Sequence, residues 1–198
     1  GIARMLRQAQ PKLFNYLFEL RSKARVKALI DIVNMKPLVH VSGMFSPWQG
    51  CASWISPVAW HPVNPNAVIV VDLARDISPL LELDAEEIRE RLYTRKDDLG
   101  ELLPIPVKLI HINKCPVLAP AATLSQERAE ALGIDRSMCR TSLDLLRNHP
   151  EIREKLTQVF ATGSEMSEKN QREAELALYE GFFQDNDKGT LELVRNTT

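Results

Sequence analysis

Between residues 2 and 33 the apolar positions recur every three or four residues, as at Leu13 and Leu17, and no glycine interrupts them. This spacing predicts helices. Pro11 suits the first turn of a helix and disfavours the α conformation at the residue before it. We therefore expect one helix to end near Gln10 and another to begin at Pro11, which gives two or three consecutive helices in this region.

From Pro37 onward, the pattern changes to short β-branched and aromatic runs separated by glycine and proline, which is typical of strands. Val39 and Val41 alternate with His40, which predicts a strand with one covered face. Residues 67–71 are apolar throughout and predict a strand in the interior of a sheet. A small antiparallel barrel of four or five strands is the simplest closure. The predicted strands are Leu38–Phe45, Ala52–Trp60, Ala67–Leu73 and Ile105–Asn113.

A helix is predicted to interrupt this β region between the third and fourth strands. Asp84 and Glu87 have the spacing of a capping box, and apolar residues follow at helical intervals. After Pro116 the pattern becomes helical, so the chain is predicted to have an α+β fold. The later predicted helices are Ser125–Leu132, Arg136–Arg147, Pro150–Phe160, Glu165 to about Phe183, and a short one near Leu191.

Composition restricts the class of protein further. The chain has 198 residues, of which 44% are hydrophobic and 26% charged, as expected for a globular protein. No apolar run approaches the roughly 20 residues of a membrane helix, and no signal-peptide pattern is present, so no membrane association is expected. The three cysteines, Cys51, Cys115 and Cys139, are odd in number and far apart. They predict neither a disulfide framework nor a zinc site, which favours a cytoplasmic location.

Charge is distributed unevenly along the chain. The formal net charge is −1, but residues 1–36 carry eight lysines or arginines against two acidic residues. The basic first segment therefore has a net charge of +6 and the remainder of −7. Such a polarised chain is compatible with an anionic partner such as a nucleic acid or an acidic peptide, and equally with a solvated helix face.

Motifs of the common enzyme classes are missing from the sequence, and the four histidines lack metal-ligand spacing. Asp72 and Asp76, at the end of the third predicted strand, are candidate Mg²⁺ ligands because carboxylates at a strand end suit that ion. The same residues also fit a strand that runs into a turn, with Arg75 as a local ion-pair partner. We favour the second interpretation.

Three tryptophans, Trp48, Trp54 and Trp60, fall six residues apart within the β region. Aromatic rings on a small barrel can stack with unpaired bases, but indoles also fill cores. We expect one of the three to stack with a base or line a groove, and two to be buried. The candidate DNA-binding residues are Lys36, Trp48, Trp54, Lys108, His111 and Lys114, although the cations among them are also consistent with scattered solvated side chains.

Several long strings of this sequence closely resemble the bacterial exodeoxyribonuclease I family. The resemblance extends from about residue 9 to about residue 185, and ungapped strings of this length are highly specific. They are Gln10–Phe18, Met35–Phe45, Trp60–Pro62, Asp76–Asp84 and Val107–Leu118.

The resemblance implies an enzyme of DNA repair that degrades single-stranded DNA from its 3′ end. Family members combine a nuclease domain, an SH3-like β-barrel and a helical domain. On this basis residues 1–34 correspond to terminal helices of the nuclease domain, residues 35–118 to the SH3-like barrel with its inserted helix, and residues 119–198 to the start of the helical domain.

The family's Mg²⁺-binding acids and catalytic histidine lie ahead of the segment that this chain resembles, so no catalytic residue can be assigned in it. The family resemblance implies Mg²⁺ for the parent enzyme and no metal for this chain, which is expected to be inactive alone. An adaptor without nuclease activity is the alternative.

Two binding roles are implied by the resemblance: closing a channel for single-stranded DNA, and docking the acidic C-terminal tail of single-stranded DNA-binding protein. For the tail, Tyr16 stands at a pocket position, and Lys36 and Arg136 at basic positions. The sequence departs from the family at Ser125, where a carboxylate-binding arginine is expected, and at Pro120, where a glutamine is expected. Arg128, one helical turn after Ser125, is the alternative carboxylate partner.

Overall fold

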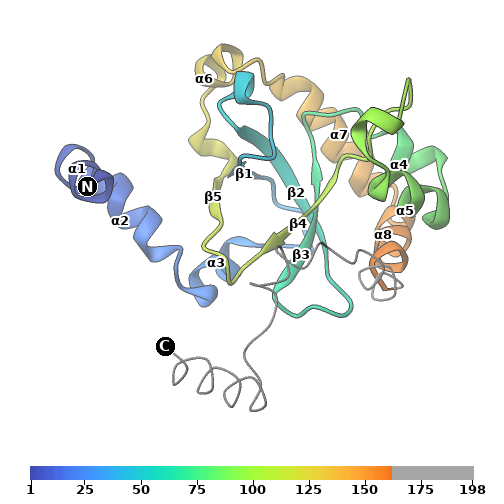
Figure 1. Ribbon diagram of the computed structural model, residues 1–198, viewed down its shortest axis with the longest axis horizontal. Coiled ribbons are helices and arrows are strands. Elements are labelled where there is room, and N and C mark those ends of the chain that lie inside the picture. The colour runs from blue at the N-terminus through green and yellow to red at the C-terminus, as the bar shows by residue number, and fades with distance from the viewer. Residues whose placement is uncertain (162–198) are drawn as a thin grey trace, which may run out of the picture. The chain divides into compact units, whose positions relative to one another are not determined.

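The computed structural model describes residues 1–161, in which five antiparallel strands form one sheet with the order β4-β3-β2-β1-β5 (Figure 1). The predicted helices beyond Glu165 lie outside the described residues. Strand order follows the chain from β1 to β4, and β5 returns to pair with β1. The strands are β1 (Leu38–Val41), β2 (Ala52–Trp60), β3 (Ala67–Asp72), β4 (Val107–His111) and β5 (Val117–Pro120).

The strands confirm most of the predicted β region. Strand β2 has the predicted bounds, and β3 is an interior strand in which every residue is buried. Strand β1 ends at Val41, earlier than predicted, because the chain turns there and the Phe45 N–H bonds to the Ser42 carbonyl at 3.0 Å. The short strand β5 was not predicted as a separate element.

The predicted one-face burial of β1 is wrong. His40 is buried and Val41 is 41% exposed, the reverse of the expected alternation. His40 is accommodated because its Nδ1 lies 2.9 Å from the Val117 carbonyl oxygen and its ring meets Phe45 edge-on. Both Leu38 and Val39 are buried, since β1 lies between β2 and β5 and apolar residues cover each of its faces.

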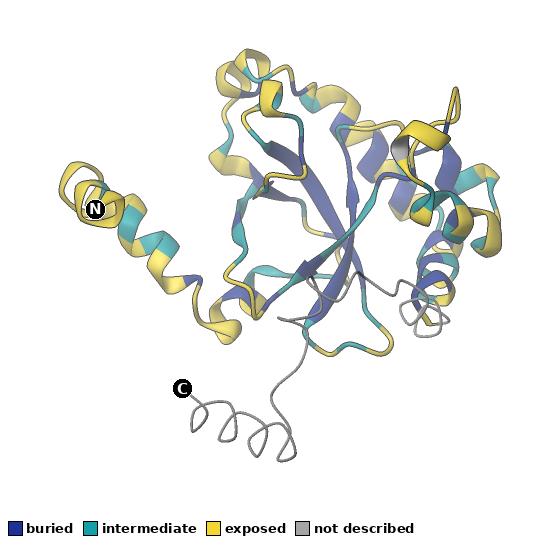
Figure 2. Cartoon of the chain, viewed as in Figure 1, coloured by how far each residue is buried: buried dark blue, intermediate teal, exposed yellow. Residues whose placement is uncertain are grey.

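Helices from the N-terminal region pack on one face of the sheet. The predicted break at Gln10 is confirmed, with Pro11 in the first turn of α2. Leu20 and Val26 join the core on this face, and Tyr16 and Leu17 of α2 pack against it. Helix α1 buries no residue and extends away from the sheet (Figures 1 and 2). The helices are α1 (Ile2–Ala9), α2 (Pro11–Glu19) and α3 (Lys23–Leu29).

The remaining helices supply the core on the other face. The predicted capping box is present: the Asp84 carboxylate accepts from the Glu86 and Glu87 N–H groups, and the Glu87 carboxylate accepts from the Asp84 N–H. Helix α4 was not predicted, because five residues are too few to show a helical period. These helices are α4 (Ser78–Glu82), α5 (Ala85–Tyr93), α6 (Gln126–Ala131), α7 (Arg136–Asn148) and α8 (Glu151–Ala161), with 3-10 turns at η1 (Pro47–Gln49), η2 (Lys96–Asp98) and η3 (Ala121–Thr123).

Two apolar cores, one on each face of the sheet, cross the boundaries predicted at residues 34 and 118. The first joins α2 and α3 to the strands, and the second joins the strands to α4, α5, α7 and α8. The described residues, 1–161, belong to one compact unit. The division at residues 34 and 118 therefore stays a prediction. Among the described helices, none has the length and apolar character needed to cross a membrane.

Candidate functional site

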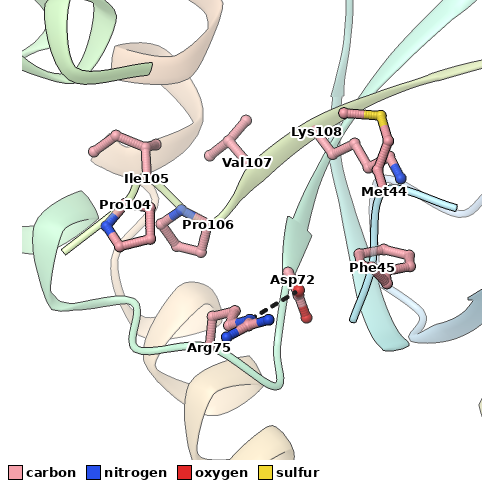
Figure 3. Close-up of a pocket in the computed structure, with 9 residues that line it drawn as sticks. All are labelled: Met44, Phe45, Asp72, Arg75, Pro104, Ile105, Pro106, Val107 and Lys108. Atoms are coloured by element: carbon pink, nitrogen blue, oxygen red, sulfur yellow. Dashed lines mark ion pairs between the residues drawn. The ribbon is translucent and has the colours of Figure 1, made fainter. Parts of the chain in front are cut away.

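A cleft of about 240 Å³ opens where β3 ends and β4 begins, beside the β1–β2 loop of residues 42–51 (Figure 3). We call it the strand-end cleft. Antiparallel pairing brings Asp72 and Val107 to the same end of the sheet, and the loop adds Met44 and Phe45. The lining residues are Met44, Phe45, Asp72, Arg75, Pro104, Ile105, Pro106, Val107 and Lys108.

Asp72 is the buried acid of the strand-end cleft, with 8% of the residue exposed. Its Oδ1 accepts hydrogen bonds from the Ser53 hydroxyl and, at 3.1 Å, from the Ala74 N–H. Its Oδ2 lies 3.8 Å from the Arg75 Nε (Figure 3). Burial raises the pKa of the Asp72 carboxyl, and its hydrogen bonds and neighbouring cations only partly offset that effect.

Lys108 supplies a cation to the same cleft. Its Nζ donates to the Ser42 Oγ at 2.7 Å and lies 4.1 Å from the centre of the Phe45 ring. Burial lowers the pKa of the Lys108 ammonium, and the Asp72 carboxylate opposes this shift. The pKa of His40, whose ring meets that of Phe45 edge-on, is also lowered by burial. The cleft therefore combines apolar walls with one acid and two cations, Lys108 and Arg75.

Of the three tryptophans, one is exposed, one is buried and one is half-buried, whereas two were expected to be buried. Trp48 lies in the β1–β2 loop with 93% of its surface exposed, and Met44 in the same loop is 81% exposed. Trp54 is only 5% exposed and has the Arg136 guanidinium 5.2 Å from its ring. The assignment of Trp54 to the DNA-binding set is therefore corrected, because a buried ring offers no face to a base. Trp60 is half-buried, with Lys27 5.5 Å from its ring.

The predicted basic residues do not form one cluster around the strand-end cleft. Only Lys108 lines it, whereas His111 and Lys114 lie at the other end of β4. Lys36 is exposed just before β1, which runs from there toward the cleft. Arg75 does line the cleft, and the sequence analysis had given it only a local ion pair with Asp72.

Asp72 and Asp76 do not have the arrangement of a Mg²⁺ site. The Asp72 carboxylate accepts from Ser53 and Ala74 and pairs with Arg75. The Asp76 Oδ1 accepts from the Ser78 N–H at 2.8 Å at the start of α4. Residues 1–161 hold no group of three or more potential metal ligands. The strand-and-turn interpretation of these acids fits their hydrogen bonds.

Two of the residues assigned to tail-peptide docking, Tyr16 and Arg136, contact different cores of the sheet. Tyr16 packs on the α2 and α3 face and donates to the Leu118 carbonyl at 2.7 Å, while Arg136 contacts Trp54 in the other core. Ser125, the first residue of the predicted helix, is the N-cap of α6 and accepts from the Arg128 N–H at 3.2 Å. Within the described part of the chain, no hydrogen bond or ion pair joins any two of Tyr16, Lys36, Arg128 and Arg136.

The antiparallel sheet, its return strand β5 and the helices inserted between β3 and β4 define an SH3-like module with an α+β fold. Residues 21–162 match the family model described as the exonuclease I SH3-like domain. This match covers most of the chain, and the chain belongs to that family.

Curated relatives extend the similarity over the whole chain. It is 53% identical over 197 residues to exodeoxyribonuclease I of Escherichia coli strain K12, and 46% identical over 198 residues to that of Haemophilus influenzae. These alignments cover 100% and 99% of this chain. The chain spans 41% of the length of each of these two relatives.

Solved structures show the same fold. E. coli exonuclease I in complex with a 5cy-dT13 oligonucleotide is 54% identical, with a TM-score of 0.81 over 97% of this chain and 40% of that chain. The metal-free form of the E. coli exonuclease I complex with single-stranded DNA is 52% identical, with a TM-score of 0.82 over 100% and 42%. A zinc-bound form of that complex is also similar to this chain.

Proposed function

We propose that this chain forms part of a single-strand-specific 3′→5′ DNA exonuclease and supplies a surface that guides single-stranded DNA. The observation that carries the proposal is the position of Trp48 and Met44, both strongly exposed in the loop that also lines the cleft of Lys108 and Arg75. An exposed ring suits an unpaired base, and cations suit the phosphates. The complexes of E. coli exonuclease I with oligonucleotides support the same function.

Titration of the chain with a labelled single-stranded oligonucleotide tests this proposal. Fluorescence anisotropy measured at several salt concentrations should show that the logarithm of the binding constant falls linearly with the logarithm of the salt concentration. An equally long duplex is the matched control and should bind less tightly, because its bases are not free to stack on an exposed ring. Absence of binding at low salt would contradict the proposal.

Mg²⁺ dependence of the parent enzyme, a role in DNA repair and a cytoplasmic location belong to the same proposal. The family resemblance supports Mg²⁺, and the hydrogen bonds of Asp72 and Asp76 leave this chain without a matching ligand set among the described residues. We expect the chain alone to release no nucleotide from a 3′-labelled strand with or without Mg²⁺. Mg²⁺-dependent cleavage that is lost in Asp72→Asn would contradict this assignment.

Docking of the acidic tail of single-stranded DNA-binding protein is a second proposed role. The observation that favours it is the exposed side chain of Arg128, one turn after the N-cap Ser125, with no ion pair in residues 1–161. A free guanidinium suits a terminal carboxylate. Arg128→Ala should weaken binding of a labelled tail peptide, while Arg140→Ala, on the exposed side of α7, should not. Unchanged tail affinity in Arg128→Ala would reject this role for Arg128.

A non-enzymatic adaptor is the alternative to the enzyme. The encoding reading frame distinguishes the two, because an Asp-x-Glu strand upstream of these residues would indicate a nuclease domain. An adaptor would bind DNA or the tail peptide and would come from a frame that lacks this motif.

A further inference from the structure

We propose that the strand-end cleft binds one base of the DNA strand, turned out of the stack, and that its polar groups favour cytosine over thymine. This inference rests on the proposed function, because it assigns a specific contact to the same DNA-guiding surface. It goes beyond that function by placing a base, rather than a phosphate, against a buried acid.

The dimensions and walls of the cleft suit a flat ring. Its volume is about 240 Å³, and its walls include Phe45, Met44, Ile105 and Val107 (Figure 3). Phe45 is buried, its ring meets that of His40 edge-on, and the Lys108 ammonium lies 4.1 Å from its centre, so Phe45 forms a fixed wall of the cleft. Of these walls, Phe45 and Ile105 are buried, whereas Met44 is 81% exposed, so Met44 offers the apolar contact surface to a base.

The buried acid gives the cleft a preference for a hydrogen-bond donor. The Asp72 Oδ1 already accepts from Ser53 and Ala74, whereas within residues 1–161 the one polar contact of Oδ2 is the ion pair with Arg75 at 3.8 Å. Because that distance is longer than a hydrogen bond, Oδ2 has accepting capacity left. In Figure 3 the carboxylate points into the space between Arg75 and Phe45. A carboxylate accepts readily from the N4 amino group of cytosine.

The two cations complete a pattern of one acceptor and two donors. The Lys108 Nζ uses one hydrogen for Ser42, which leaves two of its three N–H groups, and the Arg75 guanidinium is half-exposed at the mouth of the cleft. Cytosine presents an amino donor followed by the N3 and O2 acceptors on its pairing edge. Thymine presents a carbonyl oxygen where cytosine has its amino group, so it would place an acceptor against the Asp72 carboxylate.

An acidic peptide is the other class of ligand that two cations and apolar walls suggest. The buried Asp72 carboxylate disfavours it, because the peptide would bring a second negative charge next to this acid. A base with an amino group carries no such charge and satisfies the free oxygen.

Two measurements on the full chain test the inference. First, anisotropy titrations compare oligo-dT with an equally long strand of alternating dT and dC. We expect the mixed strand to bind about fivefold more tightly, the lower end of what one directional base contact gives. Asp72→Asn should abolish this preference, and Arg75→Ala should reduce it. Asp76→Asn is the matched control, since it makes the same change outside the cleft and should keep the preference.

Second, photocrosslinking of the unaltered chain locates the base without any variant. A strand that carries 5-iodocytosine should crosslink to Met44 or Phe45, as mapped by mass spectrometry. Equal affinity for both strands, or crosslinks confined to Trp48 while DNA still binds, would overturn the cleft assignment and leave the proposed function intact. Loss of the crosslink on adding a short acidic peptide, at unchanged DNA affinity, would show that the cleft is a peptide site. No binding of either strand would instead overturn the proposed function.

Discussion

The Lys108 ammonium lies 4.1 Å from the centre of the Phe45 ring and, at the same time, donates a hydrogen bond to Ser42. These contacts join β4 to the β1–β2 loop, which also carries Trp48. One lysine therefore both holds the loop in place and presents a positive charge at the cleft. Its removal should affect DNA binding more than the removal of a cation on an exposed helix.

We predict that Lys108→Met weakens binding of single-stranded DNA and reduces the slope of log affinity against log salt by about 1, as expected when one cation is lost from the DNA-binding surface. Lys12→Met on exposed α2 is the control for net charge and should leave the slope nearly unchanged. Anisotropy titrations of both variants across salt concentrations measure this difference. Equal slopes for the two variants would contradict a role for Lys108 in DNA binding.

Trp48 and Trp54 provide a matched pair for separating binding from stability. Trp48→Ala should lower DNA affinity by about 1 to 3 kcal/mol, the value for one stacked base, with little change in unfolding free energy. Trp54→Ala should instead destabilise the fold by about 3 to 5 kcal/mol, because it leaves a cavity in the core. Urea unfolding and anisotropy of both variants test the pair. A stability loss for Trp48→Ala would show that its ring packs against the protein.

Elements with local signals were predictable from the sequence. Pro11 begins α2, Asp84 and Glu87 form the capping box of α5, and Ser125 caps α6, because each signal depends on neighbouring residues alone. Strand β5 was missed, since it has four residues, ends in a proline and exists through its pairing with β1 far earlier in the chain.

The strand-end cleft was only partly predictable. Lys108 was singled out, but its partnership with Asp72 and Arg75 depends on the antiparallel pairing of β3 and β4, which composition does not reveal. One signal was available: Lys108 is a charged residue within an apolar run that forms a strand. Trp48 stands between predicted strands, next to Pro47, and Trp54 lies within a predicted strand, but the burial of Trp54 follows from the pairing of β2 with β1 and the contact with Arg136 of α7.

Lys155 connects α8 to the end of α4. Its Nζ lies 2.7 Å from the Leu80 carbonyl oxygen, 3.4 Å from that of Leu81 and 2.8 Å from that of Leu83. Lys155→Met keeps most of the aliphatic stem but leaves these carbonyls without their donor, so we predict a loss of about 1 to 3 kcal/mol in unfolding free energy. Arg140→Met, at an exposed position of α7, is the control, and urea unfolding measures the stability of both variants. Equal stability of the two variants would show that water replaces the ammonium at no cost.

Asp72 should give the protein a stability contribution that falls as pH rises. Burial raises the pKa of its carboxyl in the folded state, so the folded protein holds this proton more tightly than the unfolded chain does. The Asp72 contribution is therefore most favourable below the unfolded-state pKa, declines as pH rises toward the folded-state pKa, and is constant above it.

The Asp72→Asn variant carries an amide that does not titrate, so its difference in unfolding free energy from the unaltered chain isolates this contribution. We expect the unaltered chain to lose stability relative to Asp72→Asn as pH is raised through the acidic range. Urea unfolding of both proteins at a series of pH values measures the difference, and the Asp76→Asn variant controls for the exposed neighbour. A relative stability that rises with pH would mean that the ion pair with Arg75 and the hydrogen bonds outweigh burial, which would place Asp72 in a more polar site than the cleft described here.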